Sequence, residues 1–169
     1  LLFGFEEALG YLVDPDKVRD KDGISAAIMF LDLVRSLKKE GKTLADYADD
    51  FTKEFGAYVS GQISIRVDDL SAIGKLMTAL RTNPPSEVGG FKVATFLDHT
   101  KTDRQSDILV FVLENGSRLI ARPSGTEPKI KFYLDARGTD PNNAEEVLAQ
   151  FDASVRAILR QEQYGKQDC

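Results

Sequence analysis

The sequence has little of what builds disulfide frameworks or metal clusters. It contains one cysteine, Cys169, one histidine, His99, and no tryptophan among 169 residues. A single cysteine cannot form a disulfide within the chain, so we expect a reduced, cytoplasmic setting. The histidine has no second histidine or cysteine near it in the sequence, which argues against a zinc site. The sequence therefore predicts no metal site within these residues.

Two further absences restrict the partners of the protein. No apolar run approaches the roughly 20 residues that span a bilayer, so we expect no membrane partner. The formal net charge is −5, from 22 basic and 27 acidic residues. Binding to a nucleic acid backbone needs a clustered basic surface, so we expect no nucleic acid partner either. The net charge does not exclude a small anionic ligand, because an acidic protein can carry a local positive pocket.

Residues 1–56 contain an extended opening followed by two helical patterns. Apolar residues recur at helical spacing over 24–37, and Gly41 is a suitable stop. The second helix is expected to begin at Thr43, since Asp46 three residues later resembles a capping box, and to end at Gly56. Two helices without preceding strands are an incomplete unit. We interpret residues 1–56 as the end of an α/β domain.

Residues 57–169 predict an α+β domain. The helical patterns lie at 70–80 and from Asp140, a suitable N-cap, to Leu159. Asn115-Gly116 predicts a hairpin turn in which both central residues have positive φ. The strand patterns lie at 58–67, 91–97, 108–113, 118–122 and 130–134. We expect a mostly antiparallel sheet of four or five strands, covered on one face by two helices.

Between two of these strands lies the segment R-P-S-G-T-E-P-K, residues 122–129. Arg122 can hold two phosphate oxygens through its planar guanidinium, and the hydroxyls of Ser124 and Thr126 add donors. Gly125 is expected to let the backbone bend so that successive amides point into one hollow. From composition alone, a turn with no ligand is an equally good interpretation, because Ser-Gly-Thr is common turn material.

Two segments resemble a known family. R-P-S-G-T-E-P, followed by K-I-K-F-Y, closely resembles the C-terminal phosphate-binding loop of the α-D-phosphohexomutases, the phosphoglucomutase/phosphomannomutase family. G-F-E-E-A-L-G-Y at 4–11 and D-K-D-G-I at 20–24 resemble that family's sugar-binding loop and the segment after it. The resemblance implies that residues 1–56 end the family's third domain and that 57–169 form its fourth, TBP-like domain.

The resemblance also implies roles for individual residues. The non-reacting phosphate of the substrate would be held by Arg122, Ser124, Gly125, Thr126 and Lys21. Glu6 would accept hydrogen bonds from sugar hydroxyls. Alanine stands at position 8, where the family usually has a serine that contacts the sugar. The identity of the sugar phosphate therefore stays open.

Other family motifs are missing from the sequence. It contains no T-x-S-H-N-P-like serine loop and no D-x-D-x-D-R-like metal loop. The resemblance thus implies no catalytic residue in this chain, and it assigns the phosphoserine, the Mg²⁺ and the response to a sugar bisphosphate activator to missing N-terminal domains of the same protein. We expect a C-terminal fragment of a phosphosugar mutase, an isomerase, that clamps the substrate phosphate and is inactive alone. The alternatives are a non-catalytic module that binds phosphosugars or other anions, and a structural or protein-interaction domain.

Overall fold

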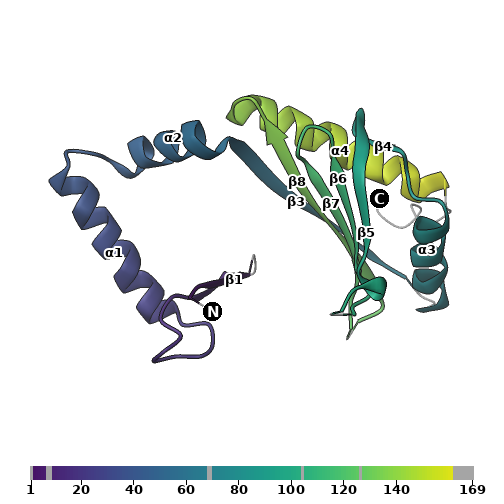
Figure 1. Ribbon diagram of the computed structural model, residues 1–169, viewed down its shortest axis with the longest axis horizontal. Coiled ribbons are helices and arrows are strands. Elements are labelled where there is room, and N and C mark those ends of the chain that lie inside the picture. The colour runs from purple at the N-terminus through teal and green to yellow at the C-terminus, as the bar shows by residue number, and fades with distance from the viewer. Residues whose placement is uncertain (1, 7–8, 68–69, 104, 126, 162–169) are drawn as a thin grey trace. The chain divides into compact units, whose positions relative to one another are not determined.

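The structure, a computed structural model, describes residues 2–6, 9–67, 70–103, 105–125 and 127–161. The chain forms two compact units, residues 1–54 and 55–169. Figure 1 shows the elements of both in the order of the sequence.

The first unit contains a short antiparallel hairpin and two helices. The hairpin pairs β1 (Gly4–Glu6) with β2 (Gly10–Leu12), and the helices are α1 (Gly23–Lys39) and α2 (Leu44–Phe55). The side chain of Asp22 caps α1 by accepting hydrogen bonds from two backbone N–H groups. Thr43 and Asp46 form the expected reciprocal capping box, with N–O distances of 2.8 and 3.1 Å. Both predicted helices are therefore confirmed.

The apolar stripes of these helices stay exposed. Leu37 is the one described residue of α1 that is buried, and no described residue of α2 is buried. Ile24, Ile28 and Leu31 of α1 are 76%, 62% and 66% exposed. Helical periodicity predicted a face that packs against a core, and the elements of this unit do not supply that core.

The second unit is a six-stranded antiparallel sheet with two α-helices and one short 3-10 helix. The strand order is β3-β8-β7-β6-β5-β4. The sequence predicted four or five strands, and the extra one is the two-residue β4, which is too short to show alternation. The strands are β3 (Ala57–Arg66), β4 (Glu87–Val88), β5 (Phe91–Asp98), β6 (Leu109–Leu113), β7 (Arg118–Pro123) and β8 (Lys129–Gly138). The helices are α3 (Leu70–Thr82), α4 (Pro141–Gln161) and the short 3-10 helix η1 (His99–Lys101).

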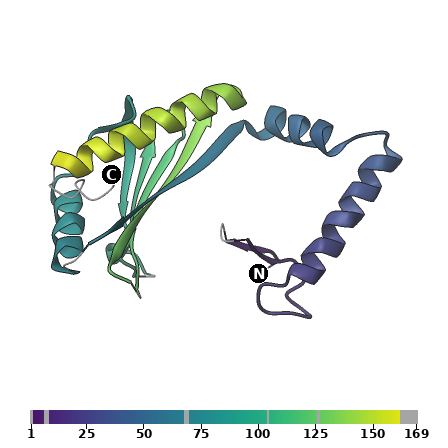
Figure 2. The same cartoon turned by 180° about the vertical axis from the view of Figure 1, so that it is seen from behind.

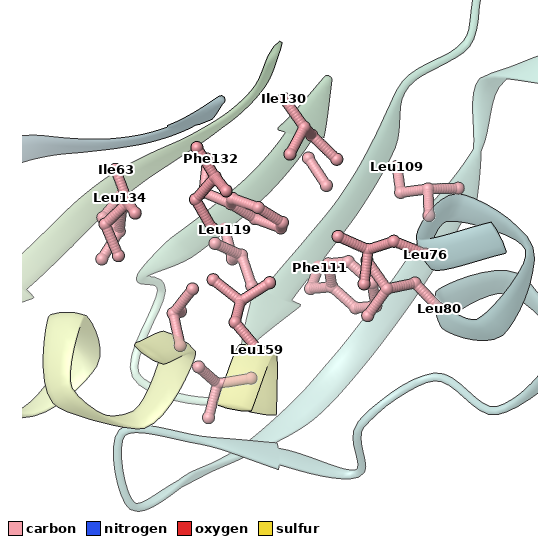
Figure 3. Packing of buried hydrophobic residues seen from close by; sticks show 14 of the residues in the cluster. Ile63, Leu76, Leu80, Leu109, Phe111, Leu119, Ile130, Phe132, Leu134 and Leu159 are labelled. Atoms are coloured by element: carbon pink, nitrogen blue, oxygen red, sulfur yellow. The ribbon is translucent and has the colours of Figure 1, made fainter. Parts of the chain in front are cut away.

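The core lies between one face of this sheet and the helices α3 and α4. Alternate side chains of β3, β6, β7 and β8 point into it. The helix α4 runs across one face of the sheet (Figures 1 and 2). Figure 3 shows Leu76 and Leu80 of α3 and Leu159 of α4 packed against the inward residues of the strands. Each fully buried side chain of this size contributes about 1.5–3 kcal/mol. The prediction of two helices on one face is confirmed.

The hairpin turn between β6 and β7 differs from the prediction. Gly116 has a φ of 85°, but Asn115 does not have positive φ. The Gly116 N–H donates to the carbonyl of Leu113, and the Leu113 N–H donates to the carbonyl of Ser117, both at 2.9 Å. The connection is thus a three-residue turn that ends in a left-handed glycine, instead of the two-residue turn that Asn-Gly favours. In this three-residue loop, only Gly116 has to adopt the left-handed backbone conformation.

The end of β8 depends on a glycine that packs against α4. A Cβ on Gly138 would lie 2.6 Å from Ala144 Cα and 2.8 Å from the carbonyl carbon of Asn143, both backbone atoms of α4. We expect Gly138→Ala to destabilise the protein by roughly 1–3 kcal/mol, because the helix must move away from the sheet. Chemical denaturation measures the change. Gly74→Ala, in α3, is the matched control: its Cβ meets nothing within 4 Å, so it should stabilise slightly. Equal effects of the two changes would contradict the packing argument.

A buried carboxylate ties β5 to α3. The Asp98 side chain is 4% exposed and accepts hydrogen bonds from Thr100 N at 3.1 Å, Thr100 Oγ1 at 2.8 Å and Arg81 Nε at 3.4 Å. Arg81 also pairs with Asp107. Burial by itself raises the pKa of Asp98, but the hydrogen bonds from Thr100 and Arg81 outweigh it and leave the pKa below the usual 3.8.

This lowered pKa predicts a pH dependence of stability. A group whose pKa falls on folding stabilises the protein above its unfolded pKa, near 3.8, and that contribution is lost as the pH falls through the folded value. We expect Asp98→Asn to lower the melting temperature at pH 7, and the difference from the unaltered protein to shrink below pH 3.8. Thermal melts between pH 7 and pH 3 measure this. A difference that stays constant over that range would contradict the assignment.

Candidate functional site

The predicted phosphate loop connects β7 to β8 and is closed by backbone hydrogen bonds. The Ser124 N–H donates to the carbonyl of Lys129 at 2.9 Å, and the Val67 N–H donates to that of Pro128 at 3.0 Å. The loop is thus tied to both β8 and the end of β3. Thr126, which the sequence placed in this loop, lies outside the described residues.

Arg122 projects from the open face of the sheet, the face opposite to the core. Its neighbour Ala121 is fully buried, whereas Arg122 is exposed. Among the residues that the structure describes, its guanidinium has no hydrogen-bond or ion-pair partner. The group is therefore accessible to an anion.

Lys131 is a second cation that the sequence reasoning missed. It lies opposite Arg122 in the β7–β8 register, and its neighbours Ile130 and Phe132 are buried, so Lys131 occupies the same open face. The alternation of residues 129–134 already showed that Lys131 points away from the core. Only the register between the strands shows which residue lies beside it.

Ser124 and Gly125 take positions that differ in part from the expectation. The Ser124 hydroxyl accepts a hydrogen bond from the Glu127 N–H at 3.3 Å, so this hydroxyl also stabilises the turn. Gly125 does not have positive φ, and a Cβ there would meet nothing within 4 Å. The bend therefore does not need the conformational freedom of glycine, which corrects the expected reason for Gly125. A side chain at this position would enter open space.

Among the residues that the structure describes, four cations and one carboxylate lie around the loop. Glu127 accepts hydrogen bonds from Arg66 at 2.6 Å and from Lys129 at 2.7 Å. The hydrogen bond and the charge of Lys129, followed by the charge of Arg66, hold the pKa of Glu127 below its usual value. With Arg122 and Lys131 on the open face, the loop region has a local excess of positive charge within an acidic protein.

The two residues assigned to the substrate in the first unit contact each other. Glu6 ends β1, and Lys21 precedes the N-cap residue of α1. Lys21 Nζ lies 2.7 Å from Glu6 Oε1, and this hydrogen bond raises the pKa of Lys21. Both side chains are about half exposed, so their polar atoms can reach a ligand. Glu7 and Ala8, in the same hairpin, lie outside the described residues.

Gly10 lies beneath this ion pair. It is buried, and a Cβ there would lie 2.7 Å from Glu6 Cγ and 2.9 Å from Lys21 Cγ. The two side chains can therefore approach each other only over a residue without a side chain. Sequence reasoning missed Gly10, because the need for glycine arises from a residue that is distant in the sequence.

At the other end of the sheet from the phosphate loop, the second unit has an open pocket of about 550 Å³. It is lined by residues from the β6–β7 turn, the end of β8 and the first turns of α4, among them Asn115, Arg137 and Asn143. No residue that the sequence assigned to a site lines it.

Within the described parts of the chain, no group of three or more His, Cys, Asp or Glu residues is arranged to hold a metal ion. Among the helices of those same parts, none combines the length and the apolar character that crossing a bilayer requires.

Two family models match the chain. Residues 63–154 match "Phosphoglucomutase/phosphomannomutase, C-terminal domain", and residues 1–55 match "Phosphoglucomutase/phosphomannomutase, alpha/beta/alpha domain III".

Curated relatives are similar over most or all of the chain. A probable phosphomannomutase from Haemophilus influenzae is 84% identical over 169 residues, which is 100% of this chain and 35% of that protein. A probable phosphoribomutase from Schizosaccharomyces pombe is 35% identical over 79% of this chain and 26% of its own length. A phosphoglucomutase from Staphylococcus aureus is 32% identical over 92% of this chain and 30% of its own length. The chain thus spans about a third of the length of these relatives, or less.

A solved structure shows the same fold. It is the open form of the exocytosis-sensitive phosphoprotein pp63/parafusin, a phosphoglucomutase from Paramecium. The similarity covers 98% of this chain and 30% of that one, with a TM-score of 0.70 and 21% sequence identity.

The packing around Gly10 yields a test. We expect Gly10→Ala to separate Glu6 from Lys21, because the new methyl group occupies the space that both side chains cross. The pKa of Lys21 should then fall toward its usual value of 10.5, which NMR titration of the lysine side chain measures. Gly23→Ala, whose Cβ would meet nothing within 4 Å, is the control and should leave that pKa unchanged. An unchanged value in the Gly10 variant would show that the pair does not depend on Gly10.

Proposed function

Because the chain belongs to the phosphoglucomutase/phosphomannomutase family, we propose that it is the C-terminal part of a phosphosugar mutase and clamps the phosphate of the substrate that is not reacting. The whole protein would interconvert a sugar 1-phosphate and its 6- or 5-phosphate, with a glucose or mannose phosphate as the substrate. The named relatives include a probable phosphomannomutase and a phosphoglucomutase, which supports this choice of sugar, and a probable phosphoribomutase, which supports a 5-phosphate instead.

The observation that carries the proposal is the exposed guanidinium of Arg122 beside Lys131. A phosphate monoester has about −1.5 to −2 charges at neutral pH and three strong acceptor oxygens. The planar guanidinium can donate two parallel hydrogen bonds to such a group, and the ammonium of Lys131 adds charge from the same face of the sheet. The N–H of Gly125, beside open space, is a further donor, whereas those of Ser124 and Glu127 already close the loop.

A clamp on the distant phosphate aids the reaction without taking part in it. Binding energy from a non-reacting group can orient the reacting one, and phosphoryl transfer depends mainly on positioning and charge stabilisation. A mutase must also accept either phosphate of its substrate in turn. A loop that recognises a dianion through a guanidinium, an ammonium and a backbone amide meets that requirement, because it binds the charged group and does not contact the sugar.

Glu6 and Lys21 are proposed to act on the sugar side of the substrate. The carboxylate of Glu6 is an acceptor for sugar hydroxyls, and Lys21 carries a charge that attracts phosphate. Their 2.7 Å contact fixes the carboxylate in place before the ligand binds. A preorganised acceptor loses less conformational entropy when it binds a hydroxyl.

The rest of the catalytic apparatus is proposed to lie outside this chain. Within the described residues, no group of three or more His, Cys, Asp or Glu side chains could hold a metal ion. We propose that Mg²⁺ and the phosphoserine belong to the N-terminal domains of the whole protein, where the phosphoserine would transfer its phosphoryl group to the sugar. The exposed apolar face of α1 would pack against the remainder of its own domain. The alternative, a binding module without catalysis, predicts that the whole protein has no mutase activity with any sugar phosphate.

Substitution of Arg122 tests the clamp. In the whole protein we expect Arg122→Ala to raise KM and to lower kcat/KM at least about tenfold, since hydrogen bonds to a charged oxygen contribute roughly 1.5–3 kcal/mol each. The melting temperature should change little, because Arg122 is exposed and has no partner among the described residues. Steady-state kinetics and thermal melts measure both.

Arg118→Ala is the matched control for this test. Arg118 lies on the same face of the same strand, but its guanidinium is paired with Asp135 at 2.6 Å. Its removal should leave kcat/KM nearly unchanged. If the two arginine variants had the same kinetics, Arg122 would not be the clamp.

A further inference from the structure

The phosphate loop contains an acid, Glu127, where an anion is expected to bind. Its own backbone N–H lies 3.3 Å from the hydroxyl of Ser124, so it belongs to the same turn as the expected phosphate ligands. A carboxylate so close to a bound dianion would repel it. Its presence therefore needs an explanation other than ligand binding.

The hydrogen-bond partners of Glu127 explain why a carboxylate lies in this loop. One carboxylate oxygen accepts from Arg66 at the end of β3, and the other accepts from Lys129 at the start of β8. Arg66 and Lys129 lie opposite each other in the β3–β8 register, as Arg122 and Lys131 do in the β7–β8 register. Glu127 thus neutralises part of the positive charge that would otherwise act on a bound phosphate.

Stability accounts for little of the Arg66 contact. The Arg66 side chain is 72% exposed and that of Glu127 is 40% exposed, whereas that of Lys129 is 18% exposed. An exposed ion pair such as Arg66–Glu127 contributes little to folding, because water screens it and long side chains lose freedom when they pair. The loop is already closed by the backbone hydrogen bonds of Ser124 and Val67.

We propose that Glu127 is a positioning residue that sets the charge of the phosphate loop. It holds Arg66 and Lys129 away from the phosphate and so limits the affinity of the loop for the dianion. The inference rests on the proposed function, because a mutase has to release one phosphate and bind the other within each cycle. Binding that is too tight slows release without helping the chemical step.

The test is the binding of inorganic phosphate to the 169-residue chain, measured by isothermal titration. We expect Glu127→Gln to bind phosphate roughly three- to tenfold more tightly, since one negative charge near a dianion is removed and two cations are released. The gain should shrink at high salt, as expected for charge interactions that water partly screens. A thermal melt of each variant checks that the fold is kept.

Asp135→Asn is the matched control. Asp135 is a carboxylate on the same face of β8 and is also paired with an arginine, Arg118. It lies four residues beyond Lys131, roughly 13 Å along the strand, so its charge is largely screened at the loop. Phosphate affinity should change less than about twofold in this variant.

The outcomes separate the inference from the proposed function. Equal or weaker phosphate binding by a folded Glu127→Gln variant would overturn the charge-setting role. If Glu127 only stabilised the conformation of the loop, the variant would bind phosphate more weakly. If Arg122→Ala does not weaken phosphate binding, the clamp itself is wrong. In the whole protein, Glu127→Gln should lower both KM and kcat, because the phosphosugar is released more slowly. If Glu127 only stabilised the conformation of the loop, the same change would raise KM.

Discussion

The register between β7 and β8 is the constraint on which the phosphate site depends. It places Arg122 opposite Lys131, and it does so because the neighbouring residues Ala121, Ile130 and Phe132 are buried in the core. A slip of β8 by one residue would turn Lys131 toward the core and Ile130 and Phe132 toward water, and Lys131 would no longer share a face with Arg122. The apolar packing of the sheet thus fixes the position of the two charges, although neither charge takes part in that packing.

Local charge, not the overall charge, decides what this protein can bind. The chain is acidic, yet the ends of β3, β7 and β8 bring four basic side chains to one loop. Glu127 reduces that excess without removing it. A site for a dianion that is bound and released repeatedly needs this intermediate strength, because the same interactions that hold a phosphate also delay its departure.

In the hairpin of the first unit, a steric requirement determines where two charged side chains lie. Gly10 leaves the space in which Glu6 and Lys21 meet, and this contact joins the hairpin to the N-terminus of α1. The helices themselves are well capped but expose their apolar stripes. Local capping interactions therefore define where these helices begin, while the packing that periodicity predicts requires residues beyond this unit.

The sequence by itself determined the helices, the longer strands, the antiparallel α+β class and the segment that forms the loop, because periodicity, caps and turn residues are local signals. It did not determine the two-residue β4, which is too short to alternate, or the turn at Asn115-Gly116, where loop length overrode the dipeptide preference. Only the tertiary structure placed Lys131 beside Arg122, Glu127 between Arg66 and Lys129, and Gly10 under the Glu6–Lys21 pair. Each of these contacts joins residues from different strands or loops, and strand register and packing decide which residues meet.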